Sequence, residues 1–435
     1  MRIVYFNPTG IVGGAEMNLL DVIASFRASR PEWPLRVVMG DEGPLGDAVD
    51  ALDVPCDVLP FPATLAGLGD SALSGGRRAR RLSASLGLAL KGPSAAFATA
   101  TYLKRLRKYF KDVRPDVVQT NGMKAHLLGT LAAPAGVPVV WHFQDFAGSR
   151  ALMGKLLRWA VRVRPGVVRV VAISKAVAAD VVRVVGPAVP VFPVYSAVDL
   201  DRFSPGPGDG PSLDAEAGLA PAPEGTVRVG LVATYARWKG HDVFLDAVSR
   251  LNADLPARFY VVGSPLYRSA GSQWSLDELK ARAESLGLTG RVGFVPHRDA
   301  PEGVFRSLDV VVHASTRPEP FGRVIVEAMS CGRAVVAAND GGAAELFEDG
   351  VSALGSPPGD PDALATRLRT LIEDPALRRT LGENGRHAAV EHFDRRRLAD
   401  GWAPAYGNEA GQPDPPLGAG PGRTSASTSR MESPP

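Results

Sequence analysis

Two carboxylates, Glu319 and Glu327, flank the predicted start of a short helix, and the chain up to Gly322 is expected to form a loop. The apolar residues that follow are spaced as on one buried helix face: Val324, Ile325, Ala328 and Met329. The first N–H groups of such a helix have no partner within it and can bind phosphate. Eight helical residues would set the carboxylates about 12 Å apart along the axis and about 80° apart around it, roughly the span from a ribose across a diphosphate to a sugar. The pattern therefore indicates a nucleotide-sugar ligand.

Two cations follow the predicted strand that ends at Ala233. Arg237 and Lys239 lie at the carboxyl end of that strand, from which both could reach a diphosphate. Positive charge there would assist the departure of a nucleoside diphosphate without a metal ion. The alternative is a solvated turn, because Arg and Lys side chains usually lie at the surface.

Further candidates follow strands in the first half of the chain. Gly13 and Gly14 lie in the first strand-to-helix loop, where residues without a Cβ let backbone N–H groups approach a phosphate or sugar closely. An ordinary tight turn is the alternative. His142 follows the apolar segment Val137–Trp141 and is expected at the carboxyl edge of the first sheet, although a lone His is more often a satisfied structural residue.

Composition excludes several classes of protein. With 49 basic and 46 acidic residues and a formal net charge of +3, the chain is too balanced to have nucleic acid as its main partner. Cys56 and Cys331 are far apart in apolar context, which argues against a disulfide framework and favours a reducing compartment. The seven His residues are scattered, and the Asp-x-Asp spacings at 199–201 and 360–362 do not directly follow an apolar strand. We therefore expect no cofactor and no divalent cation.

Short β-branched segments alternate with helical segments such as Ala15–Ser29 and Asp242–Leu251, which is typical of parallel sheets covered by helices on both faces. Two series of about five strands are predicted: Arg2–Phe6, Arg36–Met39, Asp116–Gln119, Val137–Trp141 and Val167–Ile173, then Val227–Ala233, Arg258–Val262, Val292–Phe294, Val310–His313 and Ala334–Ala338. The fold class is therefore α/β, with two Rossmann-like, doubly wound domains at residues 1–200 and 201–390. The Pro- and Gly-rich segment Ser204–Gly225 is expected to be an exposed connection near the boundary.

The ends of the chain carry separate expectations. The first residues form a strand-like segment without a basic leader, and no apolar run reaches about 18 residues, so we expect a cytoplasmic protein that is at most peripheral on the inner face of the cell membrane. A helix near residues 391–407 is expected to pack back on the first domain. Residues 408–435 have too little apolar content to offset their ordering entropy and are expected to be disordered.

The segment His313–Glu345, which includes the turn Gly341-Gly342, resembles the donor-site block of the retaining glycosyltransferases of family 4. These enzymes have the GT-B fold, in which two facing domains form a cleft. Supporting motifs occur in the same order as in the family: Gly13-Gly14-Ala15-Glu16, Trp141-His142, Ala172-Ile173-Ser174, Val198-Asp199-Leu200-Asp201-Arg202-Phe203 and Trp238-Lys239-Gly240. Together they cover most of residues 1–400.

The resemblance implies a role for each main candidate. Glu319 would bind hydroxyls of the donor sugar, and Glu327 would bind the ribose hydroxyls, since ionised carboxylates only accept hydrogen bonds. Lys239 would contact the diphosphate, whereas Arg237 replaces an Arg that the family has about three residues earlier. His142 would contact the donor sugar at its 6-position.

Other donor contacts are implied along the same cleft. Gly13 and Gly14 would lie near the diphosphate and the acceptor, and Gly263 and Val295 would line the nucleobase through their backbone. The residues across the helix start would complete the donor site: Phe321, Gly322, Arg323 and Val324. The resemblance implies that the sugar keeps its anomeric configuration by front-face substitution, in which the leaving phosphate takes the acceptor proton. Catalysis would then depend on positioning and electrostatics.

The segment Gly67–Lys111 mixes Arg and Lys with Leu, Tyr and Phe, which predicts amphipathic helices with cationic edges. The helices either rest on anionic lipid or cover the first sheet with their basic residues in water. Because this segment belongs to the acceptor-side domain, a lipid-linked acceptor is compatible with it.

The combined interpretation is a retaining glycosyltransferase that moves a hexose from a nucleoside diphosphate sugar to a hydroxyl acceptor, a glycan or a lipid-linked molecule, in cell-envelope or exopolysaccharide synthesis. Two alternatives stay open. A sugar-nucleotide epimerase of the same fold would act without an acceptor, and a non-catalytic nucleotide-sugar-binding protein would release no nucleoside diphosphate.

Overall fold

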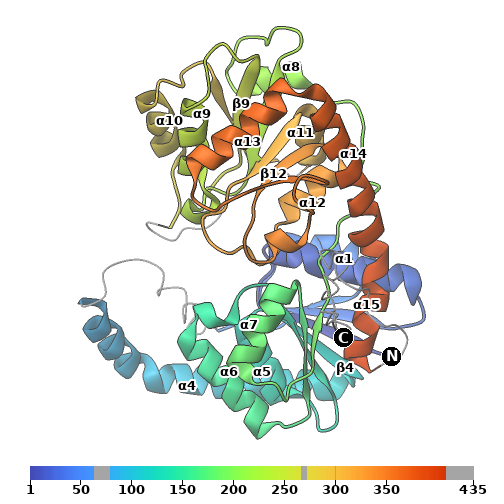
Figure 1. The fold of residues 1–435 in the computed structure, drawn as a ribbon. Helices are drawn as coiled ribbons and strands as arrows, with labels where there is room; N and C mark the ends of the chain where they lie inside the picture. Colours follow the sequence, from blue (N-terminus) through green and yellow to red (C-terminus); the bar gives the residue numbers. More distant parts are fainter. Residues whose placement is uncertain (63–78, 266–271, 299, 408–435) are drawn as a thin grey trace, which may run out of the picture.

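The computed structural model describes residues 1–62, 79–265, 272–298 and 300–407, and of residues 79–95 only the backbone. In this part of the chain two parallel sheets form two domains that face each other, with the N-terminal domain below the C-terminal one in Figure 1. The tail at 408–435 and the basic residues Arg77 and Arg78 lie outside the described residues.

The N-terminal domain is built on a parallel sheet of seven strands. Their order across the sheet is β3 (Cys56–Val58), β2 (Leu35–Met39), β1 (Ile3–Asn7), β4 (Val117–Asn121), β5 (Val139–Phe143), β6 (Val168–Ala172) and β7 (Val191–Pro193). The three central strands are buried at every position, because helices cover both faces of the sheet. Register is set by pairs such as Ile3 with Leu35 and Ile3 with Val117.

The helices of this domain form two layers, one on each face of the sheet. One layer contains α4 (Ala79–Val113), α5 (Met123–Ala132), α6 (Ala151–Val163) and α7 (Lys175–Val185). The other contains α1 (Gly14–Ser29), α2 (Pro44–Asp50) and α15 (Leu398–Tyr406).

The C-terminal domain has a parallel sheet of six strands. Their order is β10 (Val292–Val295), β9 (Ala257–Val262), β8 (Val227–Val232), β11 (Val310–His313), β12 (Ala334–Ala338) and β13 (Leu354–Ser356). One face is covered by α9 (His241–Ser249), α10 (Leu276–Ser285) and α13 (Pro361–Glu373). The other is covered by α8 (Gly210–Glu216), α11 (Glu302–Ser307), α12 (Arg323–Ser330) and α14 (Pro375–His392).

The chain crosses between the domains twice, and the two crossings lie side by side. The N–H of Val198 donates to the carbonyl of Phe393 at 2.9 Å, and the N–H of Arg395 donates to the carbonyl of Val198 at 3.0 Å. After the second crossing, α15 packs on α1, where the hydroxyl of Ser25 accepts from the N–H of Ala399 at 2.9 Å. The last described helix therefore belongs spatially to the N-terminal domain (Figure 1).

Two sequence expectations are corrected. The sheets have seven and six strands rather than about five each, because β3, β7 and β13 have three residues apiece, too few to show a periodic pattern. The segment Ser204–Gly225 is mostly exposed, yet it contains α8, whose buried Asp214 accepts from Arg228 at 2.8 Å and from the hydroxyl of Tyr260. Composition cannot reveal these long-range partners.

Candidate active site at the interdomain cleft

The two groups most directly tied to phosphate and sugar chemistry follow neighbouring strands. β8 and β11 pair in parallel although they are not consecutive, so the strand order reverses between them. Ligands of doubly wound sheets bind in the crevice at such a point. Lys239 ends the short helix η3 (Arg237–Lys239) after β8, and Glu319 lies in the loop after β11, so both occupy the same carboxyl edge.

Glu319 is held by three side chains. Lys239 Nζ lies 3.0 Å from Oε1 and 2.9 Å from Oε2 of the carboxylate. Ser315 Oγ donates to Oε2 at 2.7 Å, and His313 Nε2 lies 3.2 Å from the same oxygen. Oε2 is therefore saturated, whereas Oε1 keeps a lone pair for a ligand hydroxyl. Lys239 uses two of its three N–H bonds on the carboxylate and keeps one for a further acceptor.

Glu319 stays ionised although it is only 7% exposed. Burial by itself raises the pKa of a carboxyl group, but the Lys239 cation and the hydrogen bond from His313 outweigh it and hold the pKa of Glu319 well below its usual 4.5. The carboxylate can therefore accept a hydrogen bond from a sugar hydroxyl and cannot donate one.

The helix α12 begins where the sequence predicts, directly after Gly322. Gly322 has a φ of 104°, in the left-handed region that favours glycine, and no side chain caps the helix start. Its first N–H groups are thus available to an anion. The turn at Gly341-Gly342 supports the preceding loop: the N–H of Gly342 donates to the carbonyl of Glu319 at 2.7 Å, and a Cβ at Gly342 would lie 2.1 Å from the carbonyl oxygen of Pro320.

Arg323, the first residue of α12, links the domains. Its Nη1 donates to Asn18 at 2.8 Å and to Asp21 at 2.7 Å, both on α1, and to the carbonyl of Ala197 at 3.1 Å. The side chain is therefore committed to the domain interface, and only its backbone N–H faces the helix start. Its Nε also donates to Oε1 of Glu327 at 3.2 Å.

Glu327 keeps one carboxylate oxygen for a ligand. Its Oε1 accepts from Arg323, whereas its Oε2 accepts no hydrogen bond from the described residues. Burial raises the pKa of Glu327, and the Arg323 cation opposes that rise. The geometry is compatible with the predicted grip on a pair of ribose hydroxyls.

His142 is the penultimate residue of β5 and is buried and neutral. Its Nδ1 lies 3.0 Å from Oδ1 of Asn121 and 3.3 Å from Nε2 of Gln144; in the tautomer that donates from Nδ1 to Asn121, Nε2 has a lone pair. Burial lowers the pKa of His142 to about 3. Trp402 of α15 packs edge-on against the ring, with centroids 4.7 Å apart. His142 can therefore accept a hydrogen bond from a sugar hydroxyl, as a contact at the 6-position requires.

Arg237 has other partners than the Glu319 cluster. Its Nη2 bonds Glu278 at 2.8 Å, and its guanidinium lies 3.8 Å from the ring centre of Trp274. Two residues along η3, Lys239 turns towards Glu319 instead. In this arrangement the structure brings Lys239, and not Arg237, to the carboxylate.

The remaining predicted residues occupy distinct places. Gly13 precedes α1, and its N–H donates to Glu16 at 3.1 Å; a Cβ at Gly14 would meet no atom within 4 Å. Gly263 is required by packing, because a Cβ there would lie 1.9 Å from the carbonyl oxygen of Ala233. Val295 ends β10 and is buried, with its carbonyl accepting from Gly263 at 3.0 Å.

Phe321 and Val324 contribute through packing. Phe321 is buried between Tyr195 and Phe393, with ring centroids 6.4 and 6.0 Å away, where the chain crosses between the domains. Val324 is partly buried against the same apolar core. Their side chains thus set the position of the α12 start and leave any ligand contact to the backbone.

Sequence reasoning missed three polar residues that end or follow strands at this edge. Ser315 holds Glu319, and Asn121 orients His142 while its own Nδ2 has no hydrogen-bond partner among the described residues. Asp145 follows β5; loss of water and, to a smaller extent, the charge of Glu319 raise the pKa of Asp145. A position just after a central strand is the signal that could have found them.

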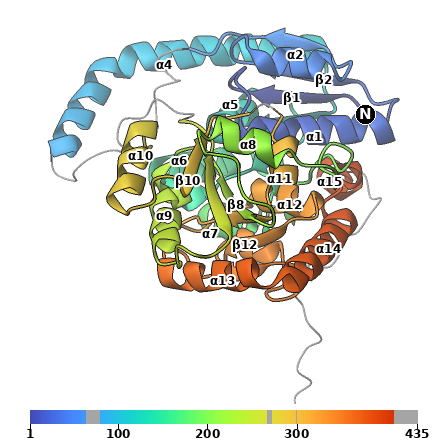
Figure 2. The ribbon, with the colours of Figure 1, turned by 90° about the horizontal axis from the view of Figure 1, so that it is seen from above.

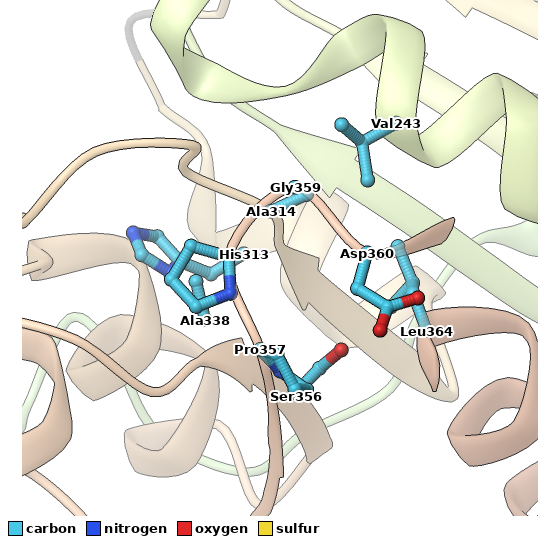
Figure 3. A pocket seen from close by; sticks show the side chains of 10 residues that line it. Val243, His313, Ala314, Ala338, Ser356, Pro357, Gly359, Asp360 and Leu364 are labelled. Carbon is cyan, nitrogen blue, oxygen red and sulfur yellow. The ribbon is translucent and has the colours of Figure 1, made fainter. Parts of the chain in front are cut away.

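A pocket beside the cluster is shown in Figure 3. It is lined by residues from the ends of β11, β12 and β13 and from the start of α13, including His313, Ala338, Ser356 and Asp360. No Lys or Arg lines it, so it does not suit a diphosphate. His313 lines this pocket and also contacts Glu319, so the pocket lies on the far side of His313 from the Glu319 carboxylate.

Two family models match consecutive parts of the chain. The model described as Glycosyltransferase Family 4 matches residues 52–202, and the model described as Glycosyl transferases group 1 matches residues 220–388. Together they cover well over half of the chain, one in each domain. The chain belongs to glycosyltransferase family 4.

Solved structures resemble most of the chain. HepE of Anabaena in complex with UDP is 26% identical, with a TM-score of 0.73 over 94% of this chain and 100% of that chain. HepE in complex with UDP-glucose is 26% identical, with a TM-score of 0.72 over 94% and 99%. The GT-B architecture is thereby established for this chain.

Curated relatives in family 4 match a shorter stretch. D-inositol 3-phosphate glycosyltransferase of Rhodococcus opacus is 36% identical over 219 residues, which is 49% of this chain and 47% of the relative. The protein of the same name from Salinispora arenicola is 34% identical over 251 residues, or 55% and 54%. The chain thus spans about half the length of the curated relatives it matches.

The structure bears on the membrane, and the comparisons leave the metal ion and the individual donor contacts as predictions. Across the described ranges, no helix is both long and apolar enough to span a bilayer. The prediction that no metal ion is required stays a prediction, as does the assignment of each donor-binding residue.

Proposed function

We propose that this family 4 protein is a retaining glycosyltransferase that moves a hexose from a nucleoside diphosphate sugar to a hydroxyl acceptor. The observation that carries the proposal is the Lys239–Glu319 pair at the uncapped start of α12. It combines a cation and free N–H groups for a diphosphate with an ionised carboxylate for a sugar. HepE, which has the same fold, is solved with UDP and with UDP-glucose, which supports this ligand class.

Each group would act through position and charge. The third N–H of Lys239 and the first N–H groups of α12 would bind the diphosphate and stabilise the negative charge that grows on it as the bond to the sugar breaks. Oε1 of Glu319 and Nε2 of His142 would accept from sugar hydroxyls, and Oε2 of Glu327 would accept from the ribose. No side chain is required as the general base.

The bond changes then balance within the donor and acceptor. The bond between the anomeric carbon and the phosphate oxygen breaks, and the acceptor oxygen bonds to the same face of that carbon. The acceptor proton passes to the leaving phosphate oxygen. Retention follows because the entering and leaving oxygens share one face.

For the acceptor we propose a glycan or lipid-linked hydroxyl in cell-envelope or exopolysaccharide synthesis, handled on the cytoplasmic side. The curated relatives are named for D-inositol 3-phosphate, but the match covers about half of each protein. D-inositol 3-phosphate therefore belongs in the acceptor panel beside lipid-linked sugars.

The test begins with the donor. We expect one nucleotide class to raise the thermal midpoint in a panel of uridine, guanosine and adenosine diphosphate sugars. With that donor, nucleoside diphosphate release should increase when the acceptor is added, and the product should keep the anomeric configuration of the donor. Sugar interconversion without an acceptor would instead identify an epimerase, and binding without release under every acceptor would identify a non-catalytic binding protein.

A further inference from the structure

The outer face of α6 carries an apolar stripe that contacts no other part of the described chain closely enough to be buried. Leu152, Leu156, Trp159 and Val163 are 67%, 36%, 49% and 45% exposed. At about 100° per residue they fall within about 60° of one another, so they form one line along the helix. The other exposed large apolar residues of the described chain are scattered singly: Ile11, Val58, Phe97, Leu276, Val351 and Val390.

The opposite face of α6 explains why the helix itself is firmly placed. Leu157 and Ala160 are fully buried, and α6 packs between α5 and α7. At its end, the Nη2 of Arg164 donates to the carbonyls of Ala133 and Pro134 at 3.1 and 3.3 Å. The helix is therefore held firmly in the domain, and the apolar stripe has a fixed position on the surface.

Basic residues border the stripe along one side. Lys155, Arg158 and Arg162 are exposed and lie about 70–130° from the stripe centre on the helix wheel. The chain from residue 117 to the end of α7 at residue 185 contains nine basic residues and two acidic ones, Asp145 and Asp180, and Asp180 pairs with Arg183 at 3.1 Å. α4, which α5 separates from α6 and which reaches out beyond the rest of the domain in Figure 2, adds the exposed cations Lys104 and Arg105.

We propose that α6 docks the protein on an anionic phospholipid bilayer through this surface, defined by Leu152, Lys155, Leu156, Arg158, Trp159 and Arg162. The apolar side chains would enter the headgroup boundary while the cations pair with lipid phosphates. A second copy of the chain fits less well, because a two-fold contact across α6 would bring the same cations together without acidic partners. Nucleic acid would satisfy the cations and leave the stripe in water.

The position of α6 also suggests what docking would achieve. The helix starts directly after the loop that leaves β5 and carries Asp145, so its Leu152 end lies at the carboxyl edge of the sheet, the edge to which His142 belongs. If the proposed transferase activity holds, docking would set the acceptor side of the cleft at the lipid surface. The binding test below does not depend on that activity.

The experiment is flotation of the full chain with vesicles of phosphatidylcholine and phosphatidylglycerol in equal parts, compared with phosphatidylcholine alone. We expect binding to the anionic vesicles, weakened by salt, and a blue shift of tryptophan emission that Trp159→Phe removes while binding persists. The double variant Leu152→Ser/Trp159→Ser should lose binding. Its control, Val351→Ser/Val390→Ser, removes apolar groups that are 43% and 45% exposed on the C-terminal domain and should bind normally.

The charge is tested separately. Lys155→Ala/Arg158→Ala/Arg162→Ala should weaken partitioning to anionic vesicles on the order of a hundredfold, at about fivefold per cation. The control Lys280→Ala/Arg369→Ala/Arg379→Ala makes the same change in net charge on the C-terminal domain and should have little effect. The proposal is overturned if the α6 variants float with the vesicles like the native protein. It is also overturned if the native protein does not float with the anionic vesicles. A native dimer that becomes monomeric in the α6 variants without any vesicle binding overturns it as well.

Discussion

The protonation state and hydrogen-bonding role of single residues at the site are set by their neighbours. Glu319 remains an ionised acceptor despite burial because Lys239, His313 and Ser315 surround it. Glu319 and Lys239 could be chosen from the sequence, since both follow predicted strands and match a family pattern. The positions of His313 and Ser315 at the end of a central strand could be noticed in the sequence, but their contacts with Glu319 could not be predicted, because these contacts depend on how the loop after β11 folds back. Nor could the pairing of Arg237 with Glu278 and Trp274, which are distant in sequence.

Lys239→Met should remove most activity. The change leaves a buried carboxylate without its cation, so we expect a loss of about 3 kcal/mol in the free energy of unfolding, measured in urea. Transfer should fall on the order of 10²–10³-fold because the diphosphate loses a charge contact.

Arg237→Met is the matched control for Lys239→Met, since it removes a cation from the same short helix. Arg237 is 39% exposed at its side chain, so its pair with Glu278 should contribute less than about 1 kcal/mol. An equal loss of activity in both variants would assign the diphosphate to Arg237 as much as to Lys239.

Glu319→Gln should change the pH dependence of stability. The folded pKa of Glu319 lies below its unfolded value near 4.5, so its contribution is complete above that pH and is lost as the pH falls further. The stability gap between the native protein and the variant should be constant near neutral pH and should shrink by about 1.4 kcal/mol per pH unit below about pH 4.5. A gap that stays level down to about pH 3 would show that the carboxyl is not stabilised in its ionised form.

Among helices and strands, the sequence pattern predicted those that are long and buried. The central strands and α12 appear where β-branched runs and apolar spacing place them, because their burial on both faces or along one stripe leaves a period in the sequence. The three-residue strands and α8 leave no such period. The exposed stripe on α6 could not be recognised either, because a helix that covers a sheet and one that also offers a second apolar face have similar sequences.

The start of α1 offers a direct test of a predicted ligand loop. Gly14→Ala adds a Cβ that would meet no protein atom within 4 Å, so the variant should fold with unchanged stability. If the donor diphosphate lies against this loop, its affinity should drop about tenfold or more in calorimetry, since overpacking typically costs 1–3 kcal/mol.

Gly303→Ala serves as its control, because its Cβ would also meet open space but lies in α11. It should bind the donor like the native protein. Identical donor affinity in both variants would return Gly14 to the role of an ordinary turn residue.

For the whole molecule, the cleft depends on contacts that fix one domain against the other. Arg323 reaches α1 from the C-terminal domain, and Glu345 accepts from the N–H groups of Lys175 and Ala176 at 2.9 and 2.7 Å at the start of α7. Two facing doubly wound domains could be predicted from the sequence. The partners across their interface could not, because they join residues more than a hundred positions apart.

Glu345→Ala should loosen this interface. Removing charge-assisted hydrogen bonds to the start of α7 should cost roughly 2 kcal/mol and speed hydrogen exchange at Lys175 and Ala176. Glu348→Ala, three residues further along, removes an exposed carboxylate and should leave exchange there unchanged. Equal exchange in the two variants would argue that Glu345 does not hold the domains together.

The most direct measurement is a crystal structure of the full chain with the nucleoside diphosphate sugar that gives the largest thermal shift. We expect the diphosphate within hydrogen-bonding distance of Lys239 Nζ and the first N–H groups of α12, the sugar at Oε1 of Glu319, and the ribose at Glu327. A donor bound elsewhere, or bound in the cleft with Glu319 and Glu327 turned away from it, would contradict the account.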